Sequence, residues 1–143
     1  MIPVVSIIDT NIVIAGLITG DTGSPPARIL DAMLSGGILY LISAELLNEY
    51  ASVLRRPKLV RLHGLSDSDI DALLTELVAN AIWREPGVAS NAPDPSDDHL
   101  WALLESDAEC LLVTGDLILV ENPPRKSSVI SARGFVDLYL PPK

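Results

Sequence analysis

The feature that most constrains the fold is an apolar run near the start of the chain that ends on an acid. Four β-branched side chains lie within five positions, at Val4, Val5, Ile7 and Ile8. Such a run is typical of a strand buried on both faces of a parallel sheet. The run ends at Asp9, and open α/β sheets bind ligands just outside the carboxyl ends of their strands. Asp9 is therefore a candidate site residue, although Asp-Thr-Asn is equally a sequence that turns the chain and caps a helix.

The composition predicts a globular protein that does not hold nucleic acid by bulk charge. Of its 143 residues, 48% are hydrophobic and 20% are charged, so we expect one domain with a sizeable core over residues 1–143. The 19 acidic residues outnumber the 10 Lys and Arg residues, and the formal net charge is -9. This excess argues against wide basic patches and suits a protein whose carboxylates hold cations.

We expect a cytoplasmic protein that contacts no membrane. A single cysteine, Cys110, allows no disulfide within the chain, which fits a reducing compartment. The first residues lack the basic segment of a signal peptide, and no apolar run approaches the roughly 18 residues that span a bilayer.

Strand patterns and helix patterns alternate along the chain. Besides the first run, short apolar runs predict strands at residues 38–42, 110–114 and 129–130. Helical spacing of apolar residues predicts helices over residues 27–34, 43–54, 66–82, 97–106 and 131–138. Residues 16–26 and 85–98 are rich in turn-forming residues and are predicted to be connections. The alternation predicts an α/β fold with a central parallel sheet and helices on both faces.

Two acids occupy equivalent places after two of the predicted strands. Asp9 follows the first run, and Asp116 follows the run at residues 110–114. If the two strands are neighbours, the carboxylates converge, and their repulsion requires compensation. A hard divalent cation with oxygen ligands supplies it. The alternative for Asp116 is a turn residue after Gly115.

Two further acids come from predicted helices. Glu49 borders the apolar face of the helix at residues 43–54, whereas Glu45 lies farther round and suits the helix dipole. Asp97 projects toward the apolar face of its helix and Asp98 lies to the side. The alternative is that Asp94 caps this helix and Asp97 completes a capping box. Paired divalent ions held by such acids catalyse phosphoryl transfer without a nucleophilic side chain.

The remaining catalytic signatures are missing or weak. The sequence has no G-x-S-x-G elbow, P-loop or G-x-G-x-x-G. His63 and His99 belong to no zinc-spaced cluster, and we expect structural or solvated roles for both, with His99 on the exposed side of its helix.

These motifs together resemble the PIN domain, over nearly the whole chain, and most closely the PIN-family toxins of bacterial toxin–antitoxin systems. The resemblance rests on residues 8–12, 43–50, 55–58, 94–98, 112–116 and 129–135. It implies a three-layer α/β/α sandwich and a Mg²⁺- or Mn²⁺-dependent endoribonuclease. The implied acidic quartet, catalytic and metal-binding, is Asp9, Glu49, Asp97 and Asp116, and Asn11 and Thr114 match supporting polar positions. A homodimer and a cognate antitoxin are further expectations from the family.

The cations after the Glu49 helix are candidates for contacts with RNA. Arg55, Arg56 and Lys58 are close together in the sequence and are suited to hold backbone phosphates. The alternative is that they complement the dipole at the end of the helix. Because only 4% of the residues are aromatic, we expect phosphate and shape contacts to outweigh base stacking.

Two other functions remain open from the sequence. A Mg²⁺-dependent phosphatase or phosphotransfer domain would use an aspartyl nucleophile after the first strand. Here Asn11 stands where such proteins have a second acid, and no lysine follows the third strand. A catalytically degenerate PIN fold that binds a partner protein is the other alternative, but burying several carboxylates without a cation is costly.

Overall fold

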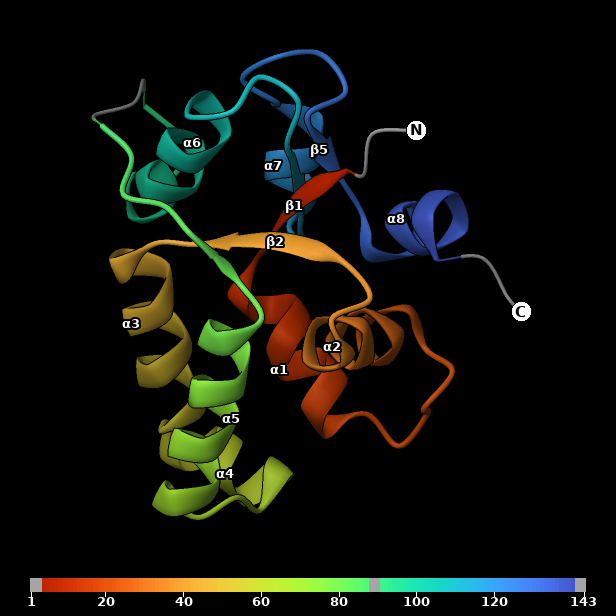
Figure 1. The fold of residues 1–143 in the computed structure, drawn as a ribbon, viewed down its shortest axis with the longest axis vertical. Coiled ribbons are helices and arrows are strands. Elements are labelled where there is room, and N and C mark those ends of the chain that lie inside the picture. The colour runs from red at the N-terminus through yellow and green to blue at the C-terminus, as the bar shows by residue number, and fades with distance from the viewer. Residues whose placement is uncertain (1–3, 88–90, 141–143) are drawn as a thin grey trace.

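The computed structural model describes residues 4–87 and 91–140, and five parallel strands form its central sheet (Figure 1). The order of the strands is β3-β2-β1-β4-β5. Their bounds are β1 Val5–Ile8, β2 Leu39–Ile42, β3 Ile82–Trp83, β4 Leu111–Val113 and β5 Val129–Ile130. In the register, Ser6 of β1 lies between Tyr40 of β2 and Leu111 of β4. The predicted parallel sheet is therefore confirmed.

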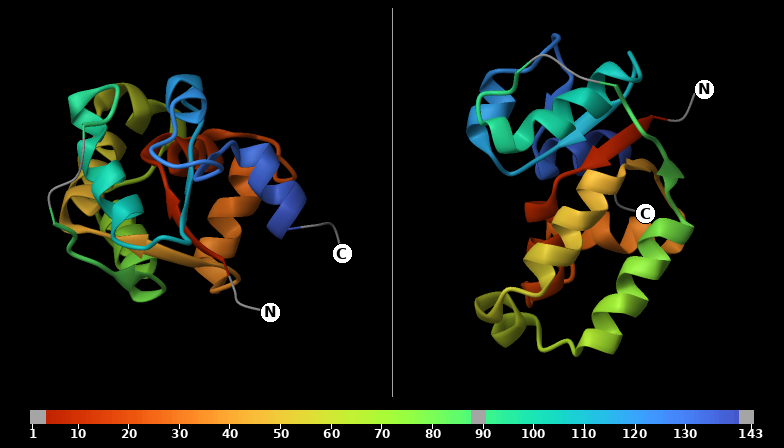
Figure 2. Two further views of the ribbon diagram at one scale, coloured as in Figure 1. Left: turned by 90° about the horizontal axis from the view of Figure 1, so that it is seen from above. Right: turned by 90° about the vertical axis from the view of Figure 1, so that its left-hand side faces the viewer.

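Helices cover both faces of this sheet. Their bounds are α1 Thr10–Ile18, α2 Pro25–Ser35, α3 Ala44–Leu54, α4 Pro57–His63, α5 Asp67–Ala79, α6 Asp98–Glu105, α7 Leu117–Glu121 and α8 Ala132–Tyr139, with a 3-10 helix η1 at Pro95–Asp97. Two views at right angles show α3 and α6 on one side of the sheet and α2 and α8 on the other (Figures 1 and 2). The fold is thus the expected three-layer α/β/α sandwich. None of the helices in residues 4–87 and 91–140 is long and apolar enough to cross a membrane.

Local signals in the sequence explain where the helices begin. Serine side chains cap α2, α3, α5 and α8, each accepting a hydrogen bond from a backbone N–H in the first turn. Before α5, Ser66 and Asp69 form a capping box. These caps position α3 so that Tyr50 is fully buried and its hydroxyl donates a hydrogen bond to the carbonyl of Ile8. The helix that carries Glu49 is thereby attached to the end of β1.

The order in which the chain adds strands to the sheet reverses between β1 and β4. From β1 the chain proceeds to β2 and β3 on one side, and β4 and β5 lie on the other. Beyond the last strand pair, the backbone N–H of Asp9 donates to the carbonyl of Val113 at 2.9 Å. The ends of β1 and β4 are therefore adjacent, as expected, and this switch point is where open α/β sheets bind ligands.

Helix α1 extends into the segment that was predicted to be a connection. The connection was expected from Gly16, but α1 continues to Ile18. A Cβ at Gly16 would lie 2.8 Å from the carbonyl oxygen of Pro26 and 3.0 Å from Cβ of Leu30. Glycine is needed here because α1 and α2 pack closely, not because the chain turns, so the prediction of a loop at Gly16 was wrong.

The region after α3 also differs from the prediction. Helix α5 ends at Ala79, and Ile82, expected in its buried stripe, forms β3 with 37% of its surface exposed. Helices α1, α4 and α7 and strand β3 were not predicted. Pro57 occupies the first turn of α4, where its missing N–H costs no hydrogen bond.

Candidate active site

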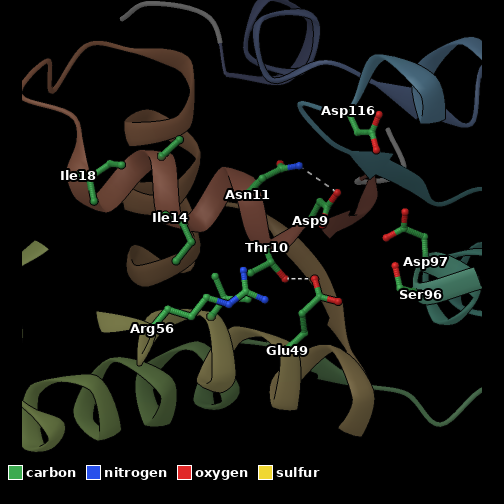
Figure 3. A pocket seen from close by; sticks show the side chains of 12 residues that line it. Asp9, Thr10, Asn11, Ile14, Ile18, Glu49, Arg56, Ser96, Asp97 and Asp116 are labelled. Atoms are coloured by element: carbon green, nitrogen blue, oxygen red, sulfur yellow. Dashed lines mark hydrogen bonds between the residues drawn. The ribbon is translucent and has the colours of Figure 1, made fainter. Parts of the chain in front are cut away.

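A cavity of about 550 Å³ lies where β1 and β4 end (Figure 3). Its lining includes all four predicted site acids, from β1, α3, η1 and the start of α7: Asp9, Glu49, Asp97 and Asp116. In Figure 3 these acids lie toward one end, and Ile14 and Ile18 of α1 lie toward the other. The fold thus brings together acids that are up to 107 positions apart, counted from 9 to 116, beside an apolar wall.

Asp9 is the most buried of the four acids, with 6% of its surface exposed. Burial raises the pKa of its carboxyl, the hydrogen bond from Thr114 opposes this, and the charge of Glu49 raises it further. Thr114 Oγ1 donates to Asp9 Oδ2 at 2.7 Å, and Asn11 Nδ2 donates to the same oxygen at 3.3 Å. Two side chains therefore hold the Asp9 carboxylate at Oδ2, and Asp9 lines the cavity.

Thr114 and Asn11 also connect the two strand ends. The backbone N–H of Asp116 donates to Thr114 Oγ1 at 3.0 Å, and that of Gly115 donates to Asn11 Oδ1 at 3.2 Å. Asp116 in turn accepts a hydrogen bond from the backbone N–H of Ile118 at 2.9 Å and caps α7. The turn role considered for Asp116 and its place in the cavity are therefore compatible.

Asp97 lies at the end of η1 and faces the other acids across the cavity (Figure 3). Burial, followed by the charges of Asp9, Asp94, Glu49 and Asp116, raises the pKa of its carboxyl to about 6. Of the two helix-capping roles considered for Asp94 and Asp97, the structure has the one for Asp94. Asp94 accepts a hydrogen bond from the N–H of Ser96 at 3.0 Å, whereas Asp97 forms no helix-capping hydrogen bond.

Glu49 is held through both of its carboxylate oxygens. Thr10 Oγ1 donates to Glu49 Oε1, and His99 Nε2 lies 3.0 Å from Glu49 Oε2. The bond to His99 lowers the pKa of Glu49; burial opposes this, and the bond from Thr10 lowers the pKa further. Burial alone would lower the pKa of His99, but the bond and charge of Glu49 outweigh it and the net shift is upward. Glu49 is therefore an ionised acid of fixed orientation.

His99 and Thr10 were missed as contributors to the site. His99 was expected on the exposed side of its helix, but its side chain is only 7% exposed, so that prediction was wrong. The signal was present, because His99 lies one helical turn before the buried Leu103 and shares its face. Thr10 directly follows Asp9 and is 4% exposed; only the packing of α1 against α3 reveals its partner.

The three cations of the predicted substrate contact lie in different surroundings. Arg56 lines the cavity, and its charge is among those that lower the pKa of Glu49. Arg55 is directed to α5 instead, with its guanidinium 3.5 Å from Asp67 and 2.5 Å from Asp71. Lys58 is exposed and is not among the described residues that line the cavity. The geometry therefore favours Arg56 and gives no support to Arg55.

The donor chemistry of the cavity fits a hard divalent cation. Its acids are oxygen ligands of the kind that Mg²⁺ and Mn²⁺ prefer. Burial, and to a smaller extent the neighbouring carboxylates, raise the pKa values of Asp9 and Asp97, and a bound cation would favour their ionised forms. Within the described ranges, however, no group of three or more His, Cys, Asp or Glu side chains is already placed to hold one ion. Like charges repel, so we expect a bound cation to draw the acid side chains closer together.

Comparison with known proteins gives one match. A sequence model of a PIN domain matches residues 5–117 and thus includes all four acids. No curated protein and no solved structure matches the chain.

Proposed function

The chain belongs to the PIN domain family, and from this premise we propose that it is an endoribonuclease that cleaves phosphodiester bonds of single-stranded RNA with Mg²⁺ or Mn²⁺. PIN domains are usually metal-dependent nucleases. The observation that carries the proposal is the convergence of four acids on one cavity at the switch point of the sheet. Such a site needs cations to become compatible with a phosphate backbone.

The four acids and the residues that hold them have proposed roles. Asp9, Asp97 and Asp116 hold the cations directly, and Glu49 is a further ligand or orients the attacking water. When bound, the cations supply activation of that water and neutralise the charge that develops on the phosphate. Thr114 and Asn11 orient the Asp9 carboxylate through the hydrogen bonds described above, and Glu49 remains ionised because His99 and Thr10 hold it.

Single-stranded RNA is the proposed substrate because of how the cavity is lined. Ile14, Ile18 and Val53 form an apolar wall next to the acids, which accommodates a base that is not stacked in a helix. Arg56 is the cation placed to hold a phosphate beside that wall. The net charge of -9 makes specific contacts of this kind more important than bulk attraction.

Family membership also motivates the wider context. We propose that the chain is the toxin of a toxin–antitoxin pair in the cytoplasm, that it forms a homodimer, and that a cognate antitoxin inhibits it. Suppression of the metal-dependent cleavage by a co-purifying protein is the property that would identify such an antitoxin.

The direct test of the proposal is cleavage of RNA by the purified chain. We expect the wild type to cleave an unstructured RNA oligonucleotide in Mn²⁺ or Mg²⁺, to lose this activity in EDTA, and to regain it when the metal is restored. A duplex of the same sequence is the control and should be cleaved far more slowly. Folded protein that binds no metal at millimolar concentration would favour the degenerate PIN fold, and a phosphorylated Asp9 would favour a phosphotransfer enzyme.

The role of Arg56 is tested against its neighbour. We expect Arg56→Gln to raise the KM for RNA about tenfold, because a charged hydrogen bond to phosphate is worth on the order of 1.5 kcal/mol. The slope of log KM against log salt concentration should fall by about 0.7, the value for one phosphate contact on a single strand. Arg55→Gln is the matched control, since it removes the same charge one residue away, and it should leave both quantities near the wild-type values. Equal effects of the two variants would refute a specific contact.

A further inference from the structure

The Glu49 carboxylate contacts a side chain of α6. His99 Nε2 approaches Glu49 Oε2 at 3.0 Å, and Thr10 holds the other oxygen. Glu49 lines the large cavity, whereas His99 is not among the described residues that line it. The imidazole is therefore linked to the cavity through Glu49.

His99 also lines a second, much smaller cavity of about 80 Å³. It lies beside Glu45 and Glu85, and both acids line it together with His99. In the described part of the chain, Nδ1 of His99 is buried and has no hydrogen-bond partner. A polar cavity of this size has room for water, and water can either donate to Nδ1 or accept from it. When water donates to Nδ1, the neutral ring carries its hydrogen on Nε2 and donates it to Glu49. When water accepts from Nδ1, Nε2 donates to Glu49 if the ring is protonated.

We propose that His99 is a positioning residue that fixes the Glu49 carboxylate for cation binding by donating the Nε2 hydrogen bond, with the small cavity supplying the water partner of Nδ1. The inference rests on the proposed metal-dependent function. Carboxylates that bind metals are themselves commonly held by hydrogen bonds, and removal of such a partner typically costs 10- to 100-fold in metal affinity or activity. His99 has the geometry of such a partner, whereas the exposed Glu45 has no comparable contact with Glu49.

The alternative is that His99 only packs α6 against α3. Its side chain is 93% covered, since 7% is exposed, and its loss would then lower the stability of the protein without changing the metal site. The two roles can be distinguished by substitution. A packing role does not depend on which ring nitrogen the new side chain imitates, whereas the positioning role requires a donor at the place of Nε2.

The test is a pair of variants that imitate different nitrogens of the ring. The amide of His99→Gln reaches the position of Nε2 and can still donate to Glu49, whereas that of His99→Asn reaches only the position of Nδ1. We expect His99→Asn to weaken Mn²⁺ binding, measured by calorimetry, by about 10- to 100-fold, and His99→Gln to restore most of it. At saturating metal, kcat for RNA should fall in His99→Asn while KM stays unchanged.

A Glu49→Ala background makes the test specific to the proposed contact. In that background, His99→Asn and His99→Gln should bind Mn²⁺ equally, since the carboxylate that they distinguish is gone. Equal Mn²⁺ affinities of the two variants in the presence of Glu49, with the stoichiometry corrected for folded protein, would overturn the proposal and leave a packing role. Absence of Mn²⁺ binding in the wild type itself would instead overturn the proposed function.

Discussion

Asp97→Asn is expected to abolish Mn²⁺ binding and to lower RNA cleavage on the order of 100-fold or more, while raising the melting temperature of the metal-free protein. The loss of function follows from the removal of a proposed ligand. The gain in stability follows from electrostatics, because the Asp97 carboxylate is partly buried among three other acids of the cavity and Asp94, and it forms no helix-capping hydrogen bond that an amide would weaken.

The dependence of stability on pH supplies a second readout of the same prediction. Asp97 has a pKa of about 6 in the folded protein against an ordinary value of 3.8, so between these values the folded state binds more protons than the unfolded state. The free energy of unfolding of the metal-free wild type should therefore fall as the pH rises from about 4 to about 6. In Asp97→Asn this fall should be smaller, which urea titrations at several pH values would measure.

Asp98→Asn is the matched control for this prediction. Asp98 accepts a hydrogen bond from the backbone N–H of Ala92 at 2.8 Å, and asparagine keeps an oxygen that can accept it. Asp98→Asn should bind Mn²⁺ like the wild type. Loss of binding in both variants, or in neither, would contradict the assignment of Asp97 to the site.

The contrast between Asp97 and Asp98 shows what sequence periodicity can predict. A helical wheel separates two adjacent acids because consecutive side chains differ by about 100° in direction. It also placed Glu49 beside the buried face of α3 and Glu45 away from it, and the structure has Glu45 exposed and Glu49 half-buried. Patterns of this kind report the surroundings of a side chain, and here they selected Glu49 and Asp97, both of which line the cavity.

The parts of the fold that escaped prediction are those that depend on contacts between distant segments. Glycine is a residue typical of loops, and only the proximity of Pro26 and Leu30 shows why one stands at position 16 within a helix. Strand β3 has two residues and is defined by its pairing with β2. The burial of His99 follows from its helical spacing to Leu103, but its partner could not be predicted, because Glu49 is 50 positions away.

Thr114→Val should reduce both the stability of the fold and the affinity for Mn²⁺, in contrast to Asp97→Asn. The Thr114 hydroxyl is fully buried, donates to Asp9 Oδ2 at 2.7 Å and accepts from the N–H of Asp116 at 3.0 Å. Valine has nearly the same shape, so the packing of β4 is preserved, but both polar partners lose their hydrogen bond. Leaving a buried polar group unsatisfied costs about 1–3 kcal/mol, and we expect Mn²⁺ affinity to fall about 10- to 100-fold.

Thr114→Ser separates the hydroxyl from the methyl group. Serine keeps both hydrogen bonds and loses one buried methyl, which costs about 0.8 kcal/mol. Thermal unfolding and Mn²⁺ calorimetry on the two variants should therefore give different patterns: serine lowers stability and leaves metal affinity near the wild-type value, whereas valine lowers both. If serine weakened metal binding as much as valine, the packing of the β4 end rather than the hydroxyl would orient Asp9. If serine instead binds metal like the wild type, the Thr114 hydroxyl is the group that orients Asp9. Its two hydrogen bonds then couple the stability of the switch point to metal binding by the acids there.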